Sequence, residues 1–447
     1  MAYDARSQTS FQIHKSGLRI SGADNQELRL LLRVARLRFT AINGLGIPLL
    51  DEVFKVANDH PPVRSAMLAL AEDLRRGSGV HGEMTAPVRY HDSLALLRAK
   101  IEQLRCGEAS EDEALEAIAC VMLLVTAGFP GSQDQSCDWA LHIRGMVTLI
   151  ELLGQETVQS TAIGRLARDM AAQFSIGLFS LGNRGPLNEL WLSWHIHPPE
   201  SEDGEEISSL EVILGYPKSL VTILSTISAV LQESFRGNVT ISTRDHVQRL
   251  FDKATKGQQL NPLLRAGGLK QMLETCLVLW QPPENLSRLS AAVRLAVTNA
   301  WEVMRKAAII HLWRGGFGAD LVTFLPDDKA RQAERLMFEM VLTMRALLSA
   351  VDDQRITIMN VMTWPVAVVA NEASGNKELQ QEVLFLLSGM QRRFSIPHIS
   401  NLINIMREVW RKVEWERLEN SSTEEIEPHQ VSAESVCLEL GVCQPLF

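Results

Sequence analysis

Apolar residues recur every three or four positions along most of the chain, a spacing that places side chains on one face of an α-helix. Tyr90, Leu94, Leu97 and Ile101 follow this spacing. Residues 117–125 are apolar on every side and predict a central, buried helix. Patterns that alternate between apolar and polar residues, as strands do, are scarce. Further helical stripes lie within residues 28–39, 143–153, 220–231 and 402–413.

The pattern predicts an all-α protein with one large multi-helix domain of about 15 to 20 helices, since only short polar or Gly-rich stretches interrupt the stripes. Gly154 follows one stripe and predicts the end of that helix. We therefore expect the chain to have three parts: a flexible N-terminal segment at residues 1–24, the all-helical domain at residues 25–418 and an acidic C-terminal tail at residues 419–447.

The tail combines acidic residues with a small apolar cluster at its end. Glu424, Glu425 and Glu427 precede the apolar stretch at residues 436–447. Acidic residues keep such a segment solvated and leave its apolar side chains available to a partner, so we expect a mobile contact peptide. The alternative interpretation is a plug, with residues 436–447 docked in a groove of the helical body.

The composition supports a folded protein with a large core and little affinity for nucleic acid. Hydrophobic residues make up 46% of the 447 positions and charged residues 22%. The formal net charge of −9 argues against a dominant surface for phosphates. Residues 1–10 lack an apolar signal core, and the longest apolar run, residues 117–129, is too short to span a bilayer. We therefore expect a soluble intracellular protein that does not contact membranes.

The six cysteines do not form a metal-binding or redox motif, because no two are spaced as Cys-x2-Cys. So few cysteines in a long chain are typical of free thiols in a reducing compartment. No phosphate-binding glycine loop follows a predicted strand. The sequence therefore predicts no cofactor, no metal site and no catalytic residues. The cysteines are Cys106, Cys120, Cys137, Cys276, Cys437 and Cys443.

The densest basic cluster is formed by Arg29, Arg33, Arg36 and Arg38. The first three share one helical face and could meet phosphates, but a solvated face of an amphipathic helix is the more common role of such a stripe. We therefore expect weak or no direct DNA binding.

A cluster of aromatic and imidazole side chains is the candidate ligand pocket. Trp191, Trp194, His195 and His197 combine large apolar walls with two groups that could orient a small-molecule effector. The two histidines are two positions apart, so they could share a metal only in an extended segment. The alternative is that both indoles simply belong to the core.

His142, which follows Asp138-Trp139, is a second candidate, as a catalytic base. No nucleophile elbow accompanies it. The alternative is structural: the imidazole contacts a neighbouring helix while Trp139 anchors the start of its own helix.

Four segments in the first half resemble, in their order, the fungal-specific transcription factor domain, the helical regulatory region that usually accompanies a zinc binuclear cluster. Residues 58–71 contain His60-Pro61 followed by a Leu/Ala-rich helix, and residues 88–98 resemble the family's Tyr-containing helix. Residues 117–125 match its buried helix. Residues 139–154 are similar to its segment with Trp, His and Gly, the most specific of the four.

The second half continues the resemblance. Residues 210–217 contain the family's Leu-Gly turn, residues 362–373 contain Trp364-Pro365, and Trp410 closes the match. The residue types at these positions have physical explanations. Trp364 and Trp410 would anchor helices in the core, and Pro365 fits the first turn of a helix. Gly145, in the first half, would let a neighbouring helix approach closely.

The resemblance implies a transcription regulator, in the nucleus or alternatively the cytoplasm. The family's DNA-reading module needs six cysteines in two clusters, and residues 1–51 contain none. Three explanations remain: a regulator that lost its cluster, a product missing its first exon, or a scaffold recruited to another task. We expect a regulator of a secondary-metabolite gene cluster that acts through protein contacts, with the transcription machinery or a DNA-binding homologue as its partner. The alternative is an enzyme or ligand-binding protein of secondary metabolism.

Overall fold

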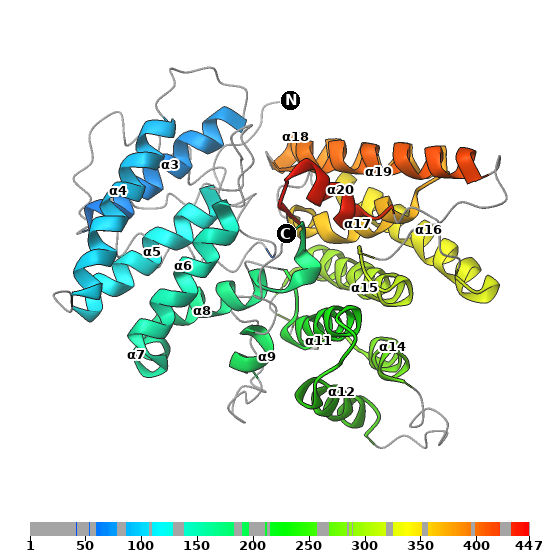
Figure 1. The fold of residues 1–447 in the computed structure, drawn as a ribbon, viewed down its shortest axis with the longest axis horizontal. Helices are drawn as coiled ribbons and strands as arrows, with labels where there is room; N and C mark the ends of the chain where they lie inside the picture. The colour runs from blue at the N-terminus through cyan, green and yellow to red at the C-terminus, as the bar shows by residue number, and fades with distance from the viewer. Residues whose placement is uncertain are drawn as a thin grey trace.

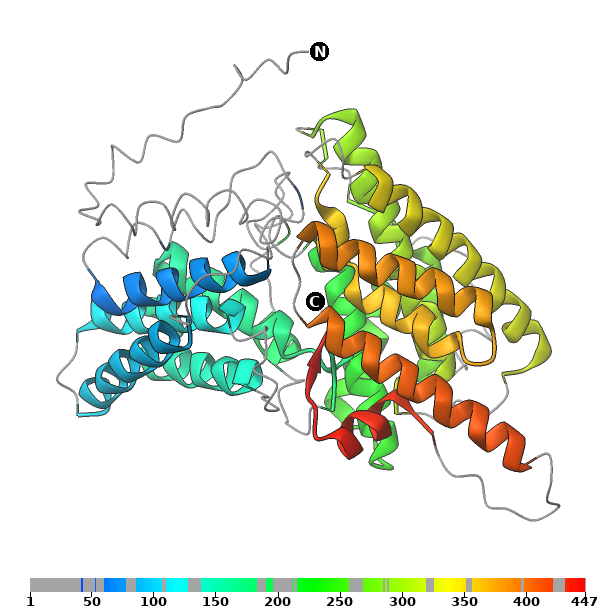
Figure 2. The ribbon, with the colours of Figure 1, turned by 90° about the horizontal axis from the view of Figure 1, so that it is seen from above.

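A computed structural model shows an all-α protein, as the sequence pattern predicts (Figure 1). Within the described ranges lie sixteen α-helices, two short 3-10 helices and two strands of two residues each. The helices form two groups that lie side by side (Figures 1 and 2). The structure describes residues 42, 53, 60–77, 86–106, 110–127, 138–182, 190–195, 211, 215–256, 268–283, 286–287, 289–318, 325–350, 356–394, 398–420 and 431–446.

The first group is built around α5. Residues 117–125 of this helix are all buried, which confirms the prediction of a central helix. On α4, Leu97 is buried and Tyr90, Leu94 and Ile101 pack against the same core, as the stripe predicts. The helices of this group are α3 Pro61–Gly77, α4 Ala86–Arg105, α5 Glu111–Ala127, α6 Asp138–Leu153, α7 Gln155–Ser160 and α8 Ala162–Phe174.

The second group is built around α17, whose residues 363–371 are all buried. Pro365 lies in the first turn of α17, where a missing N–H costs nothing. The indole N–H of Trp410 donates to the carbonyl oxygen of Ala370 at 2.7 Å and so ties α19 to α17. The helices of this group are α11 Lys218–Phe235, α12 Ile241–Ala254, α14 Leu269–Leu279, α15 Ala291–Arg314, α16 Asp327–Ala350, α17 Thr363–Glu372, α18 Lys377–Phe394 and α19 Ile399–Asn420; the 3-10 helix η6 Ile358–Val361 precedes α17.

The two groups are joined by a short crossing segment and by the end of the chain (Figure 2). The antiparallel strands β1 and β2 place Ser180 opposite Pro445. Directly after β2, the backbone N–H of Leu446 donates to the carbonyl oxygen of Phe179 at 2.8 Å. The elements concerned are η2 Gly177–Phe179, β1 Ser180–Leu181, α9 Leu190–His195, α20 Ala433–Leu440 and β2 Gln444–Pro445.

Residues 431–446, which we call the C-terminal clasp, are docked on the body. The prediction of a mobile contact peptide is wrong for these residues, and the structure has the docked arrangement that was the alternative. The physical reason is that an eight-residue helix gains little stability alone, whereas the body offers an apolar surface and a strand edge. Residues 421–430 lie outside the described part. The buried side chains of the clasp include Val431, Ala433, Val436, Cys437, Cys443 and Leu446.

Two glycines had predicted roles, one as a helix end and one as a point of close helix approach. Gly154 ends α6 with a φ of 77°, as predicted. The interpretation of Gly145 as a point of close helix approach is wrong for the described part of the chain, because a Cβ added there would meet no atom of another described element within 4 Å. Close approach occurs instead at Gly389 of α18, where a Cβ would lie 2.5 Å from Leu348 of α16.

None of the helices that the structure describes is both long enough and apolar enough to span a bilayer.

Candidate functional site

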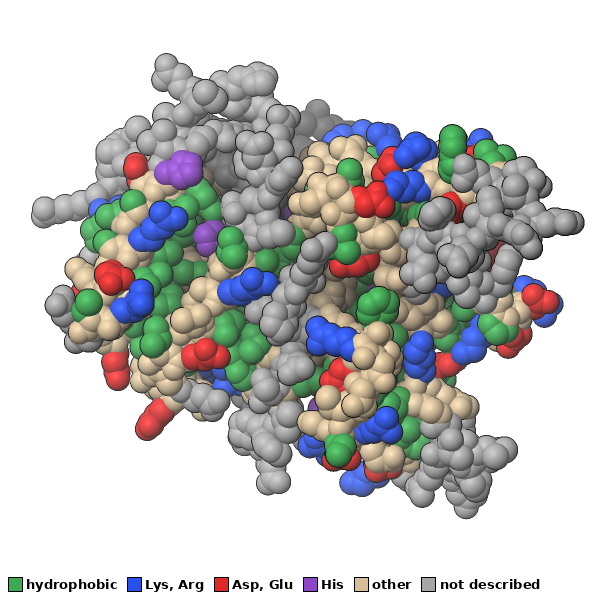
Figure 3. All heavy atoms as spheres, viewed as in Figure 1, with side chains coloured by type: hydrophobic (Ala, Val, Ile, Leu, Met, Phe, Trp, Pro, Cys, Tyr) green, Lys and Arg blue, Asp and Glu red, His purple; other side chains and the backbone are tan. Residues whose placement is uncertain are grey.

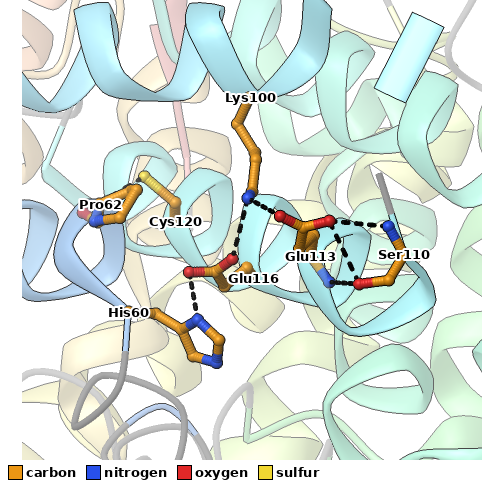
Figure 4. A network of polar contacts seen from close by, with 7 residues as sticks. All are labelled: His60, Pro62, Lys100, Ser110, Glu113, Glu116 and Cys120. Atoms are coloured by element: carbon orange, nitrogen blue, oxygen red, sulfur yellow. Dashed lines mark hydrogen bonds and ion pairs between the residues drawn. The ribbon is translucent and has the colours of Figure 1, made fainter. Parts of the chain in front are cut away.

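A buried carboxylate, Glu116 of α5, is the centre of the polar network drawn in Figure 4. Nδ1 of His60, the residue before α3, pairs with Oε1 of Glu116. Nζ of Lys100 on α4 lies 3.5 Å from Oε2 of the same carboxylate. One side chain therefore joins three helices, and both of its oxygens face basic groups.

The network continues to the start of α5. Nζ of Lys100 lies 2.5 Å from Glu113, and the backbone N–H of Ser110 donates to Glu113 at 2.7 Å. The N–H of Glu113 donates to the Ser110 hydroxyl, so these two residues form a reciprocal cap. The hydrogen bond from Lys100 lowers the pKa of Glu113 to about 2, and the same bond raises the pKa of Lys100. Both groups therefore stay charged near neutral pH.

Cys120 lies one turn further along α5. Its Sγ is 3.7 Å from the carbonyl oxygen of Pro62 and 3.6 Å from the hydroxyl of Ser93. Burial raises the pKa of this thiol to about 12, so the thiolate that a nucleophile requires is not formed near neutral pH. The network thus lacks an activated nucleophile, and its geometry serves to hold α3, α4 and α5 together.

The network was not predicted, although His60-Pro61 was part of the resemblance. A signal existed in the sequence: Glu116 is a carboxylate between Leu115 and Ala117, at the start of the wholly apolar stretch of α5. A charge at such a position is retained only where basic partners face it.

A second polar contact joins two other motifs of the resemblance. The hydroxyl of Tyr90 on α4 and Nε2 of His142 on α6 are 2.6 Å apart, with their rings edge to face. Trp139, at the start of α6, is buried. This geometry matches the structural interpretation of His142 as a contact between helices.

The predicted ligand pocket is only partly described. Trp191 is buried, and its indole N–H donates to the hydroxyl of Thr222 on α11 at 3.3 Å. Trp194 packs half-buried against the core. The side chain of His195 and the whole of His197 lie outside the described part, so the pocket stays a prediction. The same holds for the basic cluster of Arg29, Arg33, Arg36 and Arg38.

An aromatic cluster lies where the two helical groups meet. Phe179 of η2 packs against Tyr216, with ring centroids 5.2 Å apart, and against Trp364 at 5.7 Å. The hydroxyl of Tyr216 donates to the carbonyl oxygen of Val361 at 3.0 Å. Residues from the Leu-Gly turn and from the Trp-Pro motif are therefore brought into one cluster.

The clasp reaches this cluster through Glu434, one of its two acidic residues. The N–H of Glu434 donates to the carbonyl oxygen of Phe317 at 3.3 Å, and its carboxylate accepts from the N–H of Gly182 at 2.9 Å. Phe317 packs on His311, which in turn contacts Trp364. Burial lowers the pKa of His311 to about 3, so this imidazole is neutral near neutral pH.

Within the described residues, no group of three or more His, Cys, Asp or Glu side chains is placed to hold a metal ion. The described helices and polar networks form an all-α body.

Comparison with protein families identifies this body. The model of the fungal specific transcription factor domain matches residues 33–420, and the chain belongs to this family. The resemblance inferred from the sequence motifs is thus confirmed, and it supports a role in transcription regulation. Neither the curated proteins nor the solved structures gave a significant match. The match ends before the clasp at residues 431–446.

Proposed function

We propose that this chain is a transcription regulator that acts through protein contacts and is brought to DNA by a partner protein that binds DNA. The observation that carries the proposal is the family match over residues 33–420, which includes both helical groups. The printed sequence has no two cysteines spaced as Cys-x2-Cys, the spacing that a zinc binuclear cluster requires.

The electrostatics favour a partner over direct DNA binding. Phosphate contacts supply most of the non-specific affinity for DNA, and the net charge of −9 opposes them. The partner would be a DNA-binding homologue or a component of the transcription machinery, and the place of action would be the nucleus. We further propose that the target genes form a secondary-metabolite cluster, a proposal that rests on the family resemblance. We also propose that a small effector binds near Trp191 and Trp194, because of the residue types in that segment.

Transcript profiling tests this function. Deletion of the gene should change the transcript levels of a defined set of genes, and reintroduction of the full chain should restore them. The purified full chain should show no sequence-selective binding to duplex DNA at physiological salt. Unchanged transcripts together with turnover of a pathway intermediate would instead favour an enzyme built on the same scaffold.

A further inference from the structure

The turn between α11 and α12 presents two apolar side chains to solvent. Phe235, the last residue of α11, is 85% exposed, and Ile241, the first residue of α12, is 78% exposed. These are the highest values among the large apolar side chains that the structure describes. Burying such groups is favourable, so two of them at one turn indicate a contact surface.

The turn is held rigid by a buried carboxylate. Glu233 accepts a hydrogen bond from the N–H of Thr240 at 2.7 Å and another from the hydroxyl of Thr243 at 2.8 Å. The hydroxyl of Thr240 caps α12 by accepting from the N–H of Thr243. Because these bonds fix the backbone on both sides of the turn, Phe235 and Ile241 are presented in one arrangement. A preorganised surface loses little conformational entropy when it binds.

The backbone of the turn is fixed in the same way. Gly237 adopts a φ of 84°, and the N–H of Asn238 donates to the carbonyl oxygen of Glu233 at 3.1 Å. These are the features of a helix end closed by a left-handed glycine. The exposure of the two apolar side chains is therefore a property of an ordered turn.

The charge around the turn is basic. Arg236 and Arg244 are both exposed, and Nε of Arg244 donates to the carbonyl oxygen of Val239 across the turn. Between residues 232 and 245 there are two acidic residues: Glu233, which is buried and bonded inside the turn, and Asp245, which is exposed next to Arg244. The exposed side chains of this stretch therefore carry two positive charges and one negative charge. Two guanidinium groups thus flank the apolar pair, on a protein whose net charge is negative.

We infer that this turn, with Phe235 and Ile241 between Arg236 and Arg244, is a docking site for an acidic amphipathic segment of a partner protein. Apolar side chains of the segment would cover the Phe ring and the Ile side chain, and its carboxylates would pair with the guanidinium groups. A second copy of this chain fits less well, because a two-fold contact through this turn would bring arginines against arginines. This inference rests on the proposed function, since it names the kind of partner through which the regulator acts.

The test uses the purified full chain and a fluorescent helical peptide with Leu and Phe on one face and Asp and Glu on the other. Wild type should bind this peptide and should not bind the same peptide with Lys in place of each acidic residue. F235A and I241A should each weaken binding at least about tenfold, as truncation of a central contact residue does. Phe338→Ala, at another exposed site on α16, is the matched control and should bind as wild type does.

Three results would overturn the docking site: equal binding by F235A and wild type, equal binding of the Lys peptide, or stronger binding to phosphatidylserine vesicles than to the acidic peptide. Melting temperatures of the variants should equal that of wild type, because both side chains are almost fully exposed. A reporter assay separates this test from the proposed function: a chain that binds the peptide but alters no transcripts contradicts the function and leaves the docking site in place.

Discussion

The indole N–H of Trp139 donates a hydrogen bond of 3.3 Å to the carbonyl oxygen of Cys443, a residue 304 positions further along the chain. Trp139 is the second residue of α6 in the first helical group, and Cys443 directly precedes the strand β2 of the clasp. The bond links the clasp to the first group, while Glu434 and β2 link it to the crossing segment. The end of the chain therefore connects parts of the fold that are distant in sequence.

Removal of the clasp should destabilise the whole protein. A chain that ends at Gln430 exposes the surface that Val436 and Leu446 cover, and the loss of two such buried side chains costs about 3 kcal/mol or more. A large fall in melting temperature is expected. Glu439→Gln, which breaks only the surface ion pair with Lys412, is the control and should change stability by less than about 1 kcal/mol. An unchanged melting temperature after truncation would show that the clasp is not docked in solution.

Trp139→Phe should cost about 1 kcal/mol of unfolding free energy in the full chain, because the indole loses its carbonyl partner. In the chain that ends at Gln430, the same substitution should cost measurably less, since the partner is already absent. The difference between the two costs, obtained from denaturant unfolding, is the coupling energy of the pair. Equal costs in both chains would contradict the bond.

Gly182→Ala should destabilise the contact between β1 and the clasp. Its φ is +71°, and an added Cβ would collide with the carbonyl oxygen of Val442 and approach Cys437. Gly441→Ala is the matched control, because its φ is +66° and a Cβ there meets no atom within 4 Å. Both variants carry the cost of a left-handed residue, about 1 kcal/mol, and the steric clash should add about 1–3 kcal/mol at Gly182 alone. Equal melting temperatures would refute the close contact.

Glu116→Gln should cost about 3 kcal/mol, because His60 and Lys100 lose the buried charge that they share. Glu151→Gln, at an exposed position on α6, is the control and should have little effect. Circular dichroism should show that both variants keep their helices at low temperature. If the two substitutions cost the same, the network does not hold α3, α4 and α5 together.

The buried His311 should make stability depend on pH in the acidic range. Its pKa is about 3 in the folded protein, whereas an unfolded chain takes up this proton near pH 6.5. Between these values the unfolded state binds more protons, so stability falls as the pH falls from 6.5 towards 3. His311→Gln should flatten the dependence of the urea midpoint on pH over this range. An unchanged slope in this variant would show that the imidazole is not buried in its neutral form.

The helices could be predicted from the sequence because the 3.6-residue period is local. The stripe on α4, the apolar α5 and the stop at Gly154 depend only on neighbours within a few turns. Pairing between Ser180 and Pro445 leaves no such local pattern, so the sequence offered the docked tail only as the alternative to a mobile one. Gly145 was misread for a related reason, since only the packing of other helices decides which glycine lies at a close approach.

The same difference between local patterns and long-range contacts applies to the candidate sites. Trp191 could be identified as an apolar wall or as core from its residue type, but only the structure shows that its N–H donates to Thr222. The contact between Tyr90 and His142 was hidden because 52 residues separate them. Phe235 and Ile241 were missed because the sequence does not show which members of an apolar stripe the fold leaves exposed.

The most direct test of the central claim is a tethering experiment in a fungal host. The full chain is fused to a heterologous DNA-binding domain, and expression of a reporter that carries its binding sites is measured against the DNA-binding domain alone. The account predicts a clear change in reporter expression that F235A and I241A reduce and Phe338→Ala does not. Reporter expression equal to that of the DNA-binding domain alone, with the fusion present in the nucleus at normal levels, would contradict the claim that this chain regulates transcription through protein contacts.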